Sequence, residues 1–132
     1  MKEINLTLPL PPSVNTAYAG KEIRHKSKEY KEWIDLAHIA ASTQSKYKIK
    51  GDEWLGVEYK YFMPIYCKNG NKKVVDVCNY EKVLSDVLAG GKNNPPIIEG
   101  FRDHMIKTII LSKHESDRRE VEITIRELPN LI

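Results

Sequence analysis

The sequence predicts an α/β (α+β) fold, in which a mixed β-sheet has two main helices packed on it, for three reasons. Residues 54–66 alternate apolar and polar side chains as a strand does. Residues 27–45 and 80–89 instead repeat apolar side chains at helical spacing. The elements follow one another as strand, helix, strand, helix, strand, strand, without repeats or long linkers. A length of 132 residues suits one domain, 1–132, with a core of its own.

The N-terminal part of the chain predicts a strand, a loop and a helix. Residues 3–9 alternate like a strand, and the prolines of LPPSVNTAY (10–18) favour a loop with extended backbone. Ser27 is a typical helix N-cap. The helix that follows places Trp33 and Ile34 on its apolar face, which we assign to the core rather than to an interface.

The long strand 54–66 leads into a basic turn, KNGNKK (68–73). After this turn, Val74 and Val75 are expected to resume a short strand. The alternating tyrosines of the long strand are one candidate surface for pairing across a two-fold axis, although nothing in the sequence selects it.

The C-terminal part of the chain predicts a second helix and two further strands. Asn79 is expected to cap the helix 80–89, and Gly90-Gly91 to end it. Residues 104–112 and 119–127 are expected to pair as a hairpin.

Composition and charge exclude several classes of protein. No apolar run approaches the roughly 20 residues of a membrane span, and the N-terminus lacks the apolar region of a signal peptide. We therefore expect a cytoplasmic protein with no membrane partner. Cys67 and Cys78 match no zinc-binding spacing. The formal net charge of +3 permits a nucleic-acid partner without requiring one.

Acidic residues in and around the second helix form the candidate functional site. Asn79, Lys82 and Asp86 lie on one polar stripe of this helix, Asp76 precedes it, and Asp103 opens the next strand after a loop that could fold back over the helix start. We expect the acids and Lys82 to converge at one end of the sheet. Carboxylates that hold Mg²⁺, with a lysine that offsets phosphate charge, suit phosphodiester hydrolysis. The alternative is a solvated helix face on which Lys82 and Asp86 form a surface ion pair.

Three segments carry a family resemblance. LPLPPSVNTAY is similar to a strand-and-proline opening, and DVCNYEKVLSDVL to a signature of Asp-x-Asp-Asn-x-x-Lys followed by a helix with Asp and Leu. IIEGFRDHMI is similar to a late element of an apolar residue, acids and a strand. In this order and at these separations, the segments resemble the RusA family of Holliday junction resolvases over most of the chain.

The resemblance implies a metal-dependent endodeoxyribonuclease that resolves four-way DNA junctions in recombination and repair. It implies a symmetric homodimer, paired symmetric nicks, Mg²⁺ or Mn²⁺ as cofactor, and a phage or prophage origin. By position, Asp76 and Asp103 match catalytic, metal-binding acids, and Lys82 matches the catalytic lysine. Asp86 matches the acid of the helix and is expected to help hold the metal. Arg102 stands where the family often has another Asp.

Cys78 departs from the family pattern, because it stands at the second signature Asp, a metal ligand. Thiol sulfur is a soft ligand, whereas Mg²⁺ prefers oxygen. Either another acid such as Asp86 or Glu99 compensates, or the site favours a softer ion such as Mn²⁺, or the protein binds junctions without cutting them well. We favour the first, since the other signature residues are present. Cys78 itself is more typical of a small buried side chain than of a nucleophile.

Basic residues near the signature and after the N-terminal loop are candidate contacts to DNA phosphates. These candidates are Lys72, Lys73, Arg24, Lys26 and Arg102. For any one lysine in an exposed turn, solubility is the alternative explanation. Tyr18 and Phe101 either stack on exposed bases of a junction or anchor their loops.

Two competing functions remain open from the sequence. A non-catalytic or weakly active junction-binding protein would show weak metal binding but undiminished junction affinity, and Cys78 favours it. A structural or interaction domain with a solvated acidic face would show no preference for four-way over linear DNA.

Overall fold

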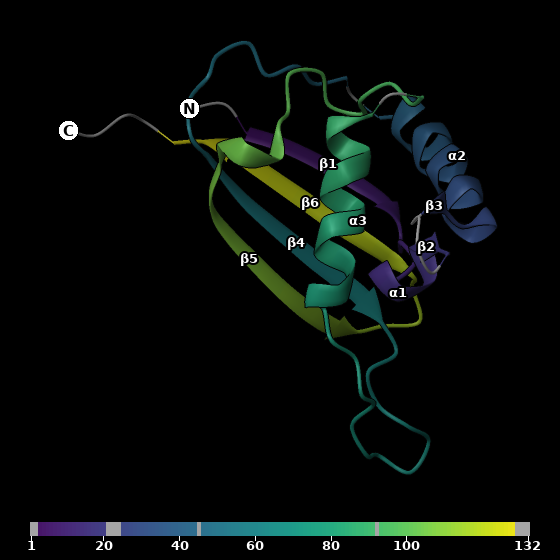
Figure 1. Ribbon diagram of the computed structural model, residues 1–132. Coiled ribbons are helices and arrows are strands. Elements are labelled where there is room, and N and C mark those ends of the chain that lie inside the picture. Colours follow the sequence, from purple (N-terminus) through teal and green to yellow (C-terminus); the bar gives the residue numbers. More distant parts are fainter. Residues whose placement is uncertain (1–2, 21–24, 45, 92, 129–132) are drawn as a thin grey trace.

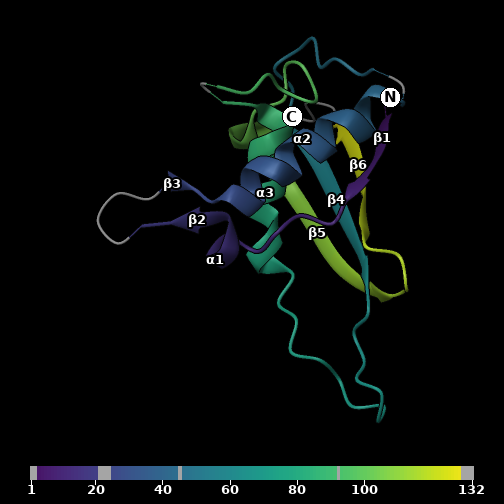
Figure 2. The same cartoon turned by 90° about the vertical axis from the view of Figure 1, so that its right-hand side faces the viewer.

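The computed structural model describes residues 3–20, 25–44, 46–91 and 93–128. Its main sheet has four strands in the order β1-β6-β4-β5. The strands are β1 (Glu3–Pro9), β4 (Leu55–Met63), β5 (Ile106–Glu115) and β6 (Glu120–Glu127), and the long helices are α2 (Lys28–Ser42) and α3 (Cys78–Ala89). Both helices cover the same face of the sheet (Figures 1 and 2). The predicted fold class and the mixed sheet are confirmed.

The core lies between this face of the sheet and the helices. Every second residue of β4 from Leu55 to Met63 is buried, as the alternating sequence predicts. Trp33 and Ile34 of α2 are buried in the same cluster, which confirms their assignment to the core. No helix among the described residues is long and apolar enough to span a membrane.

β4 and β5 are parallel neighbours, and α3 is the crossover between them. The end of β4 and the start of β5 therefore lie at opposite ends of the sheet. β6 pairs antiparallel with the other edge of β4 and with β1. The predicted hairpin of the last two strands is wrong, because β4 lies between them and pairs with both.

The prolines predicted an extended loop after β1, but part of this segment is helical. Ser13 caps a short helix, α1 (Val14–Ala17), and its Oγ accepts a hydrogen bond of 3.4 Å from the backbone N of Thr16. Two short strands follow, β2 (Tyr18–Ala19) and β3 (His25–Lys26), which pair as a separate antiparallel sheet. This small sheet lies next to α1 and α3 (Figure 2).

The helix ends follow the predictions in part. Ser27 caps α2, since its Oγ accepts a hydrogen bond of 3.1 Å from the backbone N of Tyr30. Asn79 does not cap α3, because the helix already begins at Cys78 and includes it. Gly90 ends α3 with a φ of 75°, and a Cβ there would lie 2.5 Å from the backbone N of Pro96. Only glycine fits this turn without strain.

The segment from residue 64 to residue 77 projects away from the sheet (Figures 1 and 2). Gly70, with a φ of 86°, lies in the predicted turn. Val74 and Val75 do not resume a strand, and the side chain of Val74 is fully exposed. The tyrosines of β4 are buried under α3 and both edges of β4 are paired, so β4 cannot pair across a two-fold axis.

Candidate active site

Asp76 lies immediately before α3, and its carboxylate binds the first turn of the helix. Its Oδ1 accepts a hydrogen bond of 3.0 Å from the backbone N of Cys78. A carboxylate at this position satisfies one of the N–H groups that a helix leaves unpaired and complements the positive end of the helix dipole. Asp76 thus takes the capping role predicted for Asn79, and its side chain stays exposed to solvent.

Cys78 is the first residue of α3 and is exposed. The prediction of a small buried side chain is therefore wrong. The physical reason is its position on the helix, whose buried face is formed by residues such as Leu84 and Leu88. Cys78 lies off this face and within reach of solvent.

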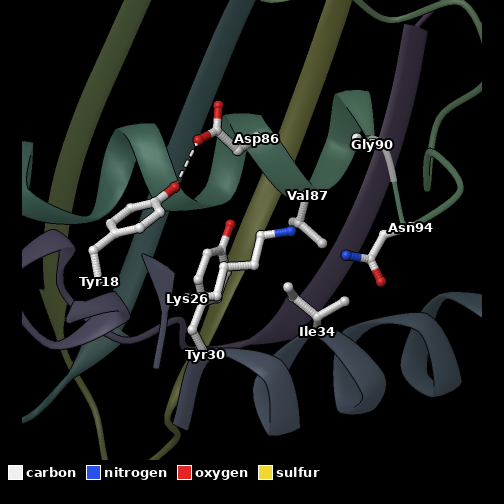
Figure 3. A pocket seen from close by; sticks show the side chains of 9 residues that line it. Tyr18, Lys26, Tyr30, Ile34, Asp86, Val87, Gly90 and Asn94 are labelled. Carbon is white, nitrogen blue, oxygen red and sulfur yellow. Dashed lines mark hydrogen bonds between the residues drawn. The ribbon is translucent and has the colours of Figure 1, made fainter. Parts of the chain in front are cut away.

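Asp86 lies two turns further along α3 and is held at one oxygen by two donors. The Nζ of Lys82 is 3.4 Å from Oδ2 of Asp86, and the hydroxyl of Tyr18 donates a hydrogen bond of 3.0 Å to the same atom (Figure 3). The charge of Asp86 is the main cause that raises the pKa of Lys82 above its usual value. Lys82 therefore carries its positive charge at neutral pH.

A cavity of about 480 Å³ lies against the C-terminal end of α3 and contains two of the predicted acids. Asp86 and Asp103 line it together with Arg102, and we refer to it as the acidic cavity. A guanidinium nitrogen of Arg102 donates a hydrogen bond of 2.8 Å to the backbone O of Phe101. Phe101 is fully buried, so the loop that carries Arg102 and Asp103 is anchored to the core.

The predicted convergence of all the acids at one end of the sheet is wrong. Asp76 lies where α3 begins, whereas the loop with Asp103 packs near the end of α3 (Figures 1 and 2). This separation follows from the parallel pairing of β4 and β5, which α3 must span. A rise of about 1.5 Å per residue places Asp86 about 12 Å along the helix axis from Cys78. Asp76 and Asp86 of one chain are thus too far apart to bind one ion directly.

The acids of the cavity nevertheless fit a hard divalent cation. Within the described parts of the chain, no three His, Cys, Asp or Glu side chains are close enough to hold a metal ion together. At phosphoryl-transfer sites, however, Mg²⁺ is usually bound by one or two carboxylates and by oxygens of the substrate phosphate. Asp86 and Asp103 supply two carboxylates in one cavity, which leaves the remaining positions around such an ion to oxygens of a substrate phosphate.

A buried chain of hydrogen bonds holds Glu81, an acid that the sequence analysis missed. The hydroxyls of Tyr59 and Ser85 are 2.9 Å apart, and Ser85 donates a hydrogen bond of 3.0 Å to Oε1 of Glu81. Burial raises the pKa of Tyr59, and the nearby charges of Glu81, Asp103 and Asp86 contribute to this effect. The signal in the sequence was the i, i+4 spacing of Glu81 and Ser85 on one helix.

Three other candidates of the sequence analysis have different positions from those expected. Glu99 does not line the acidic cavity, since it is exposed and forms an ion pair of 3.3 Å with Lys48. It is therefore not placed to compensate for Cys78. Phe101 is an anchor of its loop rather than a platform for bases. Tyr18 is half-buried and binds Asp86.

The predicted DNA-binding residues fall in separate places. Lys72 and Lys73 are exposed in the projecting segment before α3. Arg102 lines the acidic cavity, near the other end of that helix. Lys26 lines a second cavity, of about 220 Å³, which also contains Asp86 (Figure 3). Arg24 lies outside the described residues.

Comparison with known families supplies the decisive observation. The family model described as Endodeoxyribonuclease RusA matches residues 9–126, which is nearly the whole chain. The chain belongs to the RusA endodeoxyribonuclease family. The resemblance of the three sequence segments is thereby confirmed. None of the curated proteins matches the chain.

Proposed function

We propose that this RusA-family chain is an endodeoxyribonuclease that resolves Holliday junctions and other branched DNA in recombination and repair. The observation that carries the proposal is that Asp86, which forms an ion pair with Lys82, lines one cavity together with Asp103. Such an arrangement suits hydrolysis of a phosphodiester, in which negative charge develops on the transferring phosphate. Family membership then selects branched DNA as the substrate.

The residues that line the acidic cavity, and Lys82 beside them, have distinct proposed roles. Lys82 keeps its charge at neutral pH and offsets the charge on the phosphate. Arg102 carries a planar guanidinium that binds a phosphate oxygen of the adjoining backbone. Asp86 and Asp103 would hold Mg²⁺ or Mn²⁺, which when bound supplies Lewis-acid activation of the phosphate and a water of lowered pKa.

We propose a symmetric homodimer as the active form, because two equivalent sites suit two symmetric nicks. The dimer also gives Asp76 a role. Within one chain Asp76 lies at the other end of α3 from the acidic cavity, in the last part of the projecting segment 64–77 that leads into the helix (Figure 1). This segment is well placed to reach a second chain, and Asp76 would complete the cleavage site there.

The competing function is binding of junctions with little or no cleavage. Cys78 favours it, because the exposed start of α3 has a thiol where a second carboxylate would strengthen Mg²⁺ binding. A cytoplasmic location and a phage or prophage origin remain predictions of the sequence.

The test compares a labelled four-way junction with a linear duplex of the same sequence, in Mg²⁺, in Mn²⁺ and in EDTA. Our proposal predicts paired symmetric nicks in the junction, in the presence of a divalent cation and not in EDTA. Tight junction binding without nicks would favour the junction-binding protein. Equal binding to both DNAs without nicks would contradict both functions.

A further inference from the structure

Tyr18 joins the N-terminal part of the chain to the candidate active site. It lies on β2, far from α3 in sequence, yet its hydroxyl donates a hydrogen bond of 3.0 Å to Oδ2 of Asp86. In Figure 3 the ring of Tyr18 points toward Asp86 on α3, and both residues line the cavity of about 220 Å³. Neither the predicted roles nor the family signature assigns a function to this contact.

The position of Tyr18 is fixed from both sides. Its ring packs edge-on against the ring of Tyr30, with centroids 5.5 Å apart and an interplanar angle of 72°. Tyr30 is itself buried, and its hydroxyl donates a hydrogen bond of 3.3 Å to the backbone O of Val83 in α3. The preceding residue, Ala17, is fully buried, and its carbonyl accepts a hydrogen bond of 2.7 Å from Ser27. The hydroxyl of Tyr18 is therefore placed by the core.

Lys82 alone would fix Asp86 less well than Tyr18 does. The side chain of Lys82 is 64% exposed, and an exposed lysine gains little from holding one geometry. Tyr18 has a rigid ring with few rotatable bonds. Both donors bind Oδ2, so the second oxygen of Asp86 stays available and points away from Tyr18 (Figure 3).

We propose that Tyr18 is a positioning residue for DNA cleavage, which holds the carboxylate of Asp86 so that its second oxygen serves the acidic cavity. This inference rests on the proposed nuclease function. A fixed carboxylate costs no reorganisation when the substrate arrives, which is the usual reason for a supporting hydrogen bond at an active site.

The kinetic test uses Tyr18→Phe, which keeps the ring and removes the hydroxyl. Its control is Tyr47→Phe, since Tyr47 is also half-buried but lines a different cavity. We expect Tyr18→Phe to lower the single-turnover rate of junction cleavage about tenfold, because loss of a supporting partner typically costs 10- to 100-fold. Junction affinity in EDTA should stay close to that of Tyr47→Phe.

A second measurement tests the contact without cleavage. Urea unfolding of Tyr18→Phe, Asp86→Asn and the double variant should give non-additive changes of the midpoint, as for residues in contact. Additive changes, or a Tyr18→Phe variant that cuts as fast as wild type, would overturn the positioning role and leave the nuclease function intact. A wild-type protein that leaves the junction uncut would overturn both.

Discussion

The two ends of α3 carry similar acids but differ in what holds them. Toward its C-terminal end, Asp86 is bound by Tyr18 and Lys82, and it shares a cavity with Asp103. At its start, Asp76 binds the helix backbone and is exposed to solvent. The carboxylate of Asp86 is therefore held in place before any substrate arrives, whereas that of Asp76 is held as a helix cap.

Two tyrosines of β4, which lie under α3, also differ in whether their hydroxyls have a partner. The hydroxyl of Tyr59 pairs with Ser85, which in turn binds Glu81. The hydroxyl of Tyr61, two residues closer to the start of α3, is buried and has no partner among the described residues. Buried polar groups are normally paired. The groups near the C-terminal end of α3 are therefore paired within the chain, whereas the start of the helix is the end that the proposed dimer would complete.

The largest expected effect comes from mixing two inactive variants. Asp76→Asn and Asp103→Asn homodimers should both fail to cut a junction. If each site takes Asp76 from one chain and Asp103 from the other, a mixed dimer keeps one intact site and should nick one strand. Nicking by the mixture, measured on denaturing gels, would support this assignment. If the mixture is as inactive as its parts, both acids of a site come from one chain, and the assignment of Asp76 to the site of the partner is wrong.

Replacing Lys82, which pairs with Asp86, should have the next largest effect. Lys82→Met removes the charge beside Asp86 and should lower the single-turnover cleavage rate about 100-fold, as loss of one electrostatic stabiliser typically does. Lys31→Met is the control, since Lys31 is an exposed residue of α2. Cleavage rates that are equal in the two variants would contradict the role of Lys82.

A carboxylate at Cys78 should strengthen metal binding at the start of α3. We expect Cys78→Asp to lower the Mn²⁺ or Mg²⁺ concentration for half-maximal cleavage about tenfold, or about 1.4 kcal/mol. Cys67→Asp is the control, because Cys67 is also exposed but lies in the turn. An unchanged metal requirement in Cys78→Asp would mean that this end of the helix does not take part in metal binding.

The smallest effect should be on salt dependence. Replacing Lys72 and Lys73 by Ala should reduce the slope of log affinity against log salt by about 1.8, if each lysine contacts one phosphate. The matched control replaces Lys31 and Lys46, both of which are exposed. Junction binding in EDTA measures both slopes. Equal slopes in the two double variants would assign the turn lysines to solubility.

The sequence predicted the elements of the fold better than their pairing. The apolar alternation of β4 and the Ser27 cap are local features, and both are confirmed. The partner of β5 is not a local feature, because the burial pattern of a strand does not say which neighbour it takes. The prediction of a hairpin between β5 and β6 therefore failed. The predicted convergence of the acids failed because β5 pairs parallel with β4, so that the loop with Asp103 returns near the end of α3 and not near its start.

The candidate site was predictable where it follows helical spacing. Lys82 and Asp86 pair at i, i+4 as expected. Tyr18 was assigned to bases or to its own loop, because a contact between β2 and α3 depends on tertiary packing. Glu81 was missed because its partner Ser85 is a buried polar residue, and the sequence alone gave no sign of that burial.

The most direct test of whether the acidic cavity is the cleavage site compares junction cleavage by Asp103→Asn with cleavage by Asp35→Asn. Asp35 is an exposed acid of α2, so the two variants lose the same charge in different places. We predict that wild type and Asp35→Asn make paired nicks with Mg²⁺ or Mn²⁺, whereas Asp103→Asn binds the junction and cuts it at least about 100-fold more slowly. Cleavage by Asp103→Asn at the rate of Asp35→Asn would contradict the proposal that the acidic cavity is the cleavage site.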